Sequence, residues 1–265
     1  MLSLNLCVFD TSKGHFGRTD IYQRTINSLA AQAPLKLVFK NLIAHIKVGG
    51  EKEEAVFQEQ KKFYENLGFT VIRSDAEWKH FSDSHQRGYS ADLVKIYGNR
   101  EIQNADYTLH LESDWLFTVK SRQQLIDVFS AAINYLRKNP SAVSVRIPRF
   151  QNEIERIKGL KQKFGIDAGV YQDEIFNKFY RTNDNVSLNP SIFRTRDLWA
   201  ATRILKQNFD KLSNHVEMGF THAFTHLADG EYPFAFFDPK IIVARHIGTE
   251  SVDKDDPVEG AFENE

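Results

Sequence analysis

Tyr107-Thr108-Leu109-His110-Leu111-Glu112-Ser113-Asp114-Trp115, near the middle of the chain, alternates polar and apolar side chains. Apolar residues occupy one face of a predicted strand, and Thr108, His110, Glu112 and Asp114 fall on the other face. A strand that is covered on both faces of a parallel sheet is usually apolar on both, so this polar row needs a reason. Residues two apart at a strand end project in the same direction, so Glu112 and Asp114 are candidates for converging on one divalent cation. Hard carboxylate oxygens suit Mg²⁺ or Mn²⁺, which can bridge two phosphates of a diphosphate.

A second interpretation of the same triplet remains open at this point. Glu112 and Asp114 would then be surface loop residues after a strand, with Asp114 capping a following helix. Triplets with two acidic residues are common, so the spacing alone does not choose between a metal site and a loop.

The segments around this stretch alternate between strand patterns and helix patterns. Strands are predicted at 2–9, 35–48, 69–72, 107–111, 142–147 and 241–244, and helices behind Asp20 and at 51–66, 90–103, 121–138, 195–207 and 216–228. Gly68 closes the helix at 51–66. This order predicts one α/β domain with a mainly parallel sheet flanked by helices, in which ligands bind beyond the carboxyl ends of the strands.

Two segments carry no clear periodicity. Residues 146–163 are basic and fit either a solvated helix or a mobile substrate-binding segment, and 165–185 are aromatic and polar. The acidic tail at 249–265 is expected to be flexible, which leaves 1–248 as the domain.

Composition excludes several classes of protein. The 34 basic and 35 acidic residues give a net charge of -1, which does not indicate a nucleic-acid surface. Cys7 is the single cysteine and lies in an apolar run, so it is expected to be inert core, and the fold does not rely on a disulfide. No apolar run reaches the ~18 residues of a membrane-spanning helix, and the first ten residues lack a signal-peptide pattern, so a cytoplasmic location is expected.

Taken together, these features resemble the GT-A glycosyltransferases, and family-2-like members especially. The likeness spans about residues 4–248 and rests on the triplet Glu112-Ser113-Asp114 after a mid-chain strand. It continues in 185–193, which resembles the acceptor-side strand, in Glu217 at the position of the catalytic base, and in His246 at the position of a C-terminal metal ligand. Where this chain has Glu112, the commonest residue of the family is aspartate.

The resemblance implies metal-dependent transfer of a hexosyl group from a nucleotide-sugar donor, a UDP-sugar being favoured, to a carbohydrate or other hydroxyl acceptor, with inversion. It implies Mn²⁺ or Mg²⁺ on Asp114 and His246, and Glu217 as the general base. Glu112 would contact the ribose or a metal-bound water. The residues implied in nucleotide and donor binding are Phe9, Asp10, Thr11, His85, Arg87, Asp92, Glu112 and Ser113.

Other functions remain as alternatives. A nucleotidyltransferase uses a similar metal and nucleotide, but Lys13-Gly14-His15 is only a faint match to its basic, glycine-rich signature. An inactive carbohydrate-binding transferase-like module fits the aromatic content of 12%. His222 and His226 have the i, i+4 spacing of a helical zinc pair but lack the accompanying glutamate, which favours packing or a solvated face.

Overall fold

The computed structural model of the chain describes residues 2–12, 20–32, 34–49, 53–74, 85–99, 102–147, 167–170, 176–182, 188, 190–212, 216–228, 233–239 and 243–247. The loop 13–19, most of the basic segment predicted at 146–163 and the acidic tail at 249–265 lie outside these residues. Predictions made for those three segments therefore remain predictions.

In the described part of the chain, nine strands form one sheet in the order β3-β2-β1-β4-β9-β6-β10-β8-β7. Its strands are β1 Leu4–Thr11, β2 Asn41–Lys47, β3 Thr70–Ser74, β4 Tyr107–Glu112, β6 Ser144–Arg146, β7 Asp167–Val170, β8 Phe176–Thr182, β9 Ser191–Arg194 and β10 Phe234–Pro239. The half from β3 to β4 is entirely parallel. The strand β9 runs antiparallel between β4 and β6, and β10 is parallel to β6 but antiparallel to β8.

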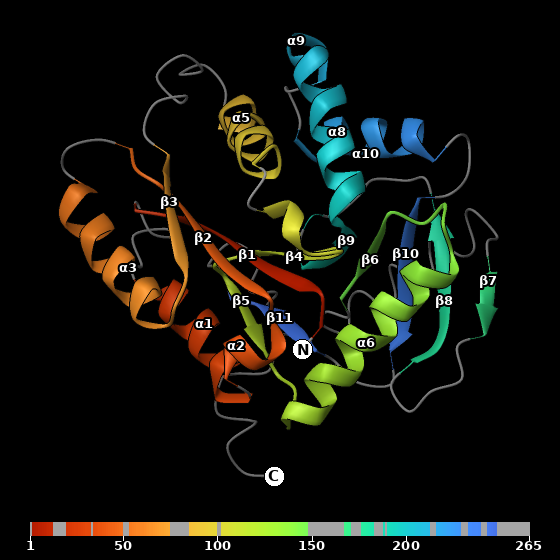
Figure 1. Cartoon of the computed structure of the whole chain (residues 1–265), viewed down its shortest axis with the longest axis horizontal. Helices are drawn as coiled ribbons and strands as arrows, with labels where there is room; N and C mark the ends of the chain where they lie inside the picture. The colour runs from red at the N-terminus through yellow and green to blue at the C-terminus, as the bar shows by residue number, and fades with distance from the viewer. Residues whose placement is uncertain are drawn as a thin grey trace.

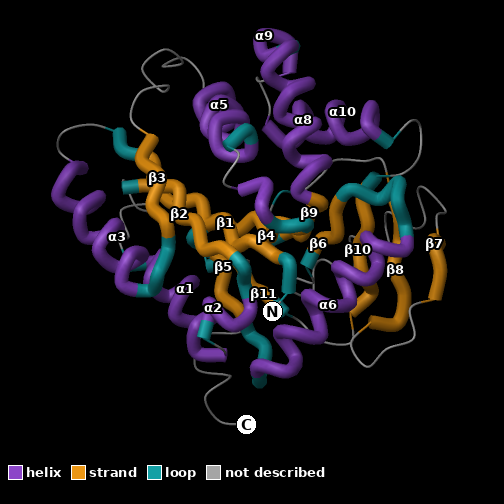
Figure 2. The backbone as a smooth tube through the Cα atoms, in the orientation of Figure 1, coloured by secondary structure: helices purple, strands orange, loops and turns teal. Residues whose placement is uncertain are grey.

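Helices cover both faces of this sheet, as Figures 1 and 2 show. One group consists of α1 Ile21–Gln32, α2 Leu35–Val38, α3 Glu54–Asn66 and α6 Arg122–Lys138. The other consists of α5 His85–Tyr97, α8 Thr195–Gln207, α9 Phe209–Leu212 and α10 Val216–Leu227. A two-stranded ribbon of β5 Trp115–Phe117 and β11 Ala244–His246 is separate from the main sheet.

The strand β1 shows why the sheet has a core on each side. Leu6 and Val8 pack into the cluster under α1, α3 and α6, whereas Cys7 and Phe9 pack into the cluster under α5, α8 and α10. Successive side chains of a strand point to opposite faces, so a strand buried on both faces must be apolar almost throughout. The predicted α/β architecture, with a mainly parallel sheet between helices, is confirmed.

One secondary-structure prediction was wrong in part. The single strand predicted at 35–48 is the short helix α2 followed by β2. Pro34, with φ of -55°, stands at the N-cap, and Leu35 and Val38 share the buried side of the helical turn. A short apolar run does not distinguish a strand from a buried helical turn.

The aperiodic stretch at 165–185 contains β7 and β8, which the pattern did not reveal. The predicted end of α3 is confirmed, because Gly68 has φ of 85°, a conformation that residues with a Cβ rarely adopt. None of the helices in the described ranges is long and apolar enough to cross a membrane.

Candidate functional site

The carboxyl ends of β1 and β4 lie side by side and form the base of the site. The two strands are parallel neighbours in which Phe9 pairs with Glu112. Beyond them, the backbone N–H of Ser113 donates to the carbonyl of Phe9 at 2.9 Å, and its Oγ donates to Oδ1 of Asp10 at 2.7 Å. Ser113 is buried, so its role in the structure is to join the two strand ends.

Asp10 is held by donors from its own chain. Its carboxylate accepts from Ser113 Oγ, from the backbone N–H of Thr11 at 2.8 Å, and from Gln60 Nε2 and Tyr64 OH at 3.1 Å each. A carboxylate offers about four acceptor positions, and these four donors match that capacity. Asp10 therefore links β1 to α3 and to the turn at Ser113 that follows β4. The predicted contact of Asp10 with a nucleotide base stays a prediction.

The side chain of Phe9 is also turned into the protein. It is 5% exposed and packs between aromatic rings of neighbouring elements, 5.3 Å from His45 on β2 and 4.7 Å from His110 on β4. A contact between this ring and a nucleotide base would require the ring to leave the core. Thr11, at the end of β1, is half-buried and remains a candidate through its backbone and side chain.

Asp114 and His246 meet, although they are 132 residues apart in the sequence. Nε2 of His246 lies 2.7 Å from Oδ2 of Asp114, and the backbone N–H of Ile247 donates to the carbonyl of Asp114 at 2.8 Å. The ribbon of β5 and β11 makes this contact, because it pairs His246 with Trp115, the residue after Asp114. The ring of Trp115 packs 4.9 Å from the imidazole.

The route of this contact differs from the one expected. We expected the last strand to deliver His246 to the edge of the parallel sheet, whereas β11 pairs antiparallel with β5 outside it. The helix-cap interpretation of Asp114 is wrong, because the strand β5 follows it directly.

The Asp114–His246 pair fits a divalent metal in its chemistry and spacing. An imidazole nitrogen and a carboxylate oxygen are common ligands of first-row metals. Two ligands at right angles, each roughly 2.1 Å from an ion, lie about 3 Å apart, close to the 2.7 Å seen here. No group of three or more acidic, histidine or cysteine side chains suited to a metal occurs among the described residues.

Glu112 contacts α5. Its Oε1 accepts a hydrogen bond of 2.7 Å from Tyr89 OH, and Tyr89 OH also lies 3.4 Å from Nε2 of His110. Tyr97 OH contacts the other ring nitrogen of His110. The two carboxylates of the triplet therefore have different partners, and they do not converge on one point as the strand pattern predicted.

Burial shifts the pKa values of His110 and Tyr89. It lowers the pKa of His110 to about 3, so the imidazole is neutral near pH 7. Burial also raises the pKa of Tyr89 well above its ordinary value, and the charge of Glu112 adds to this effect. Sequence reasoning missed Tyr89 and Tyr97, because nothing in the sequence links two tyrosines of α5 to the polar row of β4.

The remaining predicted residues lie on α5 and α10. Asp92 is 1% exposed and accepts a hydrogen bond from Ser74 Oγ at the end of β3, which gives it a structural contact. The backbones of His85 and Arg87 lie in the first turn of α5, and their side chains are outside the described part of the chain.

Glu217 lies in the first turn of α10. Its Oε1 accepts a long hydrogen bond of 3.4 Å from the backbone N–H of Leu188. Its charge is the smallest of the causes that raise the pKa of Tyr89, after burial, Glu112 and Tyr97. On the same helix, His222 and His226 are exposed, as the solvated-face interpretation predicts.

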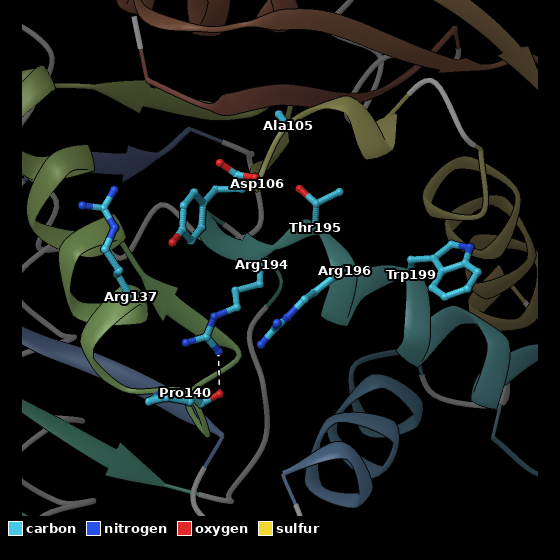
Figure 3. Close-up of a pocket in the computed structure, with 9 residues that line it drawn as sticks. Ala105, Asp106, Arg137, Pro140, Arg194, Thr195, Arg196 and Trp199 are labelled. Atoms are coloured by element: carbon cyan, nitrogen blue, oxygen red, sulfur yellow. Dashed lines mark hydrogen bonds between the residues drawn. The ribbon is translucent and has the colours of Figure 1, made fainter.

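A cavity of about 520 Å³ lies at the opposite end of β4 (Figure 3). Tyr107 lines it, and five residue steps of ~3.3 Å separate Tyr107 from Glu112, roughly 17 Å along the strand. Its buried Arg194 donates to the carbonyls of Leu136, Asn139, Pro140 and Ala142. This arginine thereby satisfies the carbonyls at and just beyond the C-terminus of α6, so its positive charge has a structural role.

No protein-family profile and no curated protein sequence matches the chain. Among solved structures, GalNAc-T7 with UDP, GalNAc and Mn²⁺ has a TM-score of 0.51 at 10% identity, with 91% of this chain and 43% of that chain covered. The mannosyltransferase PcManGT from Pyrobaculum calidifontis, with GDP-Man and Mn²⁺, has a TM-score of 0.47 at 10% identity, with coverages of 92% and 56%.

The 4-diphosphocytidyl-2C-methyl-D-erythritol synthase from Anaerococcus prevotii has a TM-score of 0.43 at 11% identity, with 89% of this chain and 88% of that chain covered. The chain spans about half the length of the two sugar transferases. At such low identity, the likeness to GalNAc-T7 bears on the fold alone. On the basis of this likeness, the chain has a fold of the GT-A type.

Proposed function

We propose that the chain is a metal-dependent glycosyltransferase, family-2-like, which transfers a sugar from a nucleoside diphosphate sugar to an acceptor hydroxyl with inversion. The contact between Asp114 and His246 at the end of β4 carries the proposal. A histidine nitrogen and a carboxylate oxygen brought together from distant parts of the chain, beside the edge where α/β sheets bind ligands, suit a divalent ion with a diphosphate. The resemblance favours a UDP-sugar as the donor and Mn²⁺ or Mg²⁺ as the ion.

The roles of the residues follow from the charges that change in the reaction. Asp114 and His246 would hold the ion, which when bound neutralises the charge that develops on the departing diphosphate. Glu112 would orient the ribose from its position against α5. Glu217 would take the proton of the attacking hydroxyl. The resemblance of the segment around Glu217 to the catalytic-base position of GT-A enzymes supports this assignment.

The alternative role of Glu217 is structural. A glutamate in the first turn of a helix stabilises the helix dipole, and Glu217 occupies such a position at the start of α10. A stabilising role would make Glu217→Gln lower the melting temperature while transfer continues at a near-normal rate. A general base would give the reverse pattern, with transfer lost and stability kept.

One set of incubations tests the proposal against the alternatives. The protein is mixed with Mn²⁺, candidate donors and acceptors, and the released products are separated. Release of a nucleoside diphosphate supports sugar transfer, whereas release of pyrophosphate from a nucleoside triphosphate supports nucleotidyl transfer. Nucleotide binding without any turnover would identify a binding module. If guanosine or thymidine diphosphate raises the melting temperature and uridine diphosphate does not, the choice of a UDP-sugar is wrong.

A further inference from the structure

Four polar side chains form a continuous chain between α5 and β4. Tyr97 OH contacts Nδ1 of His110, Nε2 of His110 lies 3.4 Å from Tyr89 OH, and Tyr89 OH lies 2.7 Å from Oε1 of Glu112. The ring of Phe9 packs 4.7 Å from His110, 5.8 Å from Tyr89 and 5.9 Å from Tyr97. This apolar ring helps to keep water away, and hydrogen bonds in such surroundings are stronger than in water.

The chemistry of these groups fixes the direction of every proton. The Glu112 carboxylate only accepts, so the single hydroxyl proton of Tyr89 points to it. The Tyr89 oxygen can then only accept from His110, which places a proton on Nε2. Because burial keeps His110 neutral, its Nδ1 carries no proton and accepts from Tyr97.

We propose that Tyr89 is a positioning residue of the donor site, which holds Oε1 of Glu112 at the end of a hydrogen-bond chain running from Tyr97 through the Nε2–H tautomer of His110. The role in donor binding rests on the proposed function. Glutamate has one more rotatable bond than aspartate, so a carboxylate at this position needs a partner to fix its orientation. Tyr89 supplies that partner before a ligand arrives, which lowers the cost of ordering Glu112 on binding.

The tautomer of His110 tests the direction of the hydrogen bonds between Tyr97 and Glu112 without any substrate. Long-range ¹H–¹⁵N correlation spectra of the ¹⁵N-labelled protein at pH 7 distinguish the two neutral tautomers from imidazolium, and His110→Gln assigns the signal. The expected result is a protonated Nε2 and an unprotonated Nδ1. A proton on Nδ1, or an imidazolium ring, would overturn the proposed direction.

A double-mutant cycle tests the positioning role, with Mn²⁺ and uridine diphosphate as the probe in titration calorimetry. Tyr89→Phe should weaken binding by about five- to tenfold, which is within the range for the net contribution of one ordinary hydrogen bond. In the Glu112→Ala background the same replacement should change affinity by less than about twofold, because nothing remains to be positioned. Equal losses in the two backgrounds would show that Tyr89 does not act through Glu112.

Two further results separate this inference from the proposed function. Tyr135→Phe removes a hydroxyl from a tyrosine buried in α6, so it controls for the general effect of losing a buried hydroxyl, and binding should be unchanged. If the wild-type chain binds no nucleotide with Mn²⁺, the proposed function fails, and with it the donor-site role of Tyr89. In that case the tautomer of His110 would still show in which direction the hydrogen bonds between Tyr97 and Glu112 run.

Discussion

Replacing Asp114 by asparagine should remove metal-dependent nucleotide binding while leaving the fold intact. Asparagine has the shape of aspartate and keeps an oxygen that can accept a hydrogen bond from Nε2 of His246. In the wild-type protein this nitrogen lies 2.7 Å from Oδ2 of Asp114. It lacks the negative charge that a divalent ion requires. The metal-free protein should therefore change in stability by less than about 1 kcal/mol, since the internal hydrogen bond survives.

Asp114→Ala is the matched comparison, because it removes the hydrogen bond as well as the charge. The Asp114 side chain is 8% exposed, and His246 Nδ1 already lacks a partner among the described residues, so the imidazole would lose the contact of its other nitrogen. A buried polar group left unsatisfied costs about 1–3 kcal/mol. At ~2–4 °C per kcal/mol for a chain of this size, the metal-free melting temperature should fall by roughly 2–12 °C.

Titration calorimetry with uridine diphosphate, with Mn²⁺ or with a chelator, separates the two effects. Loss of a direct ligand should weaken binding in Mn²⁺ at least as much as the 10- to 100-fold typical of outer-shell changes, that is, by about 1.4–2.7 kcal/mol or more. Both variants should show this loss. Wild-type affinity of Asp114→Asn in Mn²⁺ would refute the assignment, and so would an equal loss in chelator.

Three further outcomes are expected. Glu217→Gln should lower transfer by ~10²- to 10⁴-fold with donor affinity kept, and full activity would remove Glu217 from the mechanism. Arg194→Met should lower the free energy of unfolding by about 2–4 kcal/mol in denaturant titrations, because several carbonyls beyond α6 lose their donor; Arg203→Met, which loses only an exposed cation–π contact, should cost less than about 1 kcal/mol. Burial lowers the pKa of His45 to about 3 in the folded protein, whereas in the unfolded chain it is about 6.5. On acidification the unfolded state therefore binds a proton before the folded state does. The free energy of unfolding should fall as the pH drops from about 6.5 toward 3, by up to ~1.4 kcal/mol per pH unit. His45→Gln should flatten that decline in denaturant titrations, and an unchanged slope would contradict the assignment.

Much of the fold could be predicted because most of its elements have the periodicity of their class. The helix predicted at 195–207 has the bounds of α8, whose apolar residues recur on one face. The strand β7 has only four residues, and the aromatic and polar residues of β8 do not alternate, so neither strand could be predicted in this way. The helix α2 was mistaken for part of a strand because it is only one turn long.

The site was predictable in part. The acidic triplet marked the strand end beside which Asp114 and His246 meet, but the partner of Asp114 came from the resemblance, since no local pattern links two residues separated by 132 positions. The ribbon that brings them together has only three residues in each strand, too few to carry a periodic signal. Tyr89 gave no signal because a tyrosine on a helix is usually part of the core.

The polar row on β4 has a different explanation from the one that the sequence suggested. Thr108 Oγ1 lies 2.9 Å from Oγ1 of Thr195 at the start of α8, and His110 and Glu112 have tyrosine partners on α5. Buried polar groups must be satisfied, and each member of this row contacts a polar group of a covering helix. The row therefore fixes β4 against α5 and α8 over its whole length. After the turn at Ser113, Asp114 contacts His246 on the ribbon, so the two carboxylates of the triplet contact different elements.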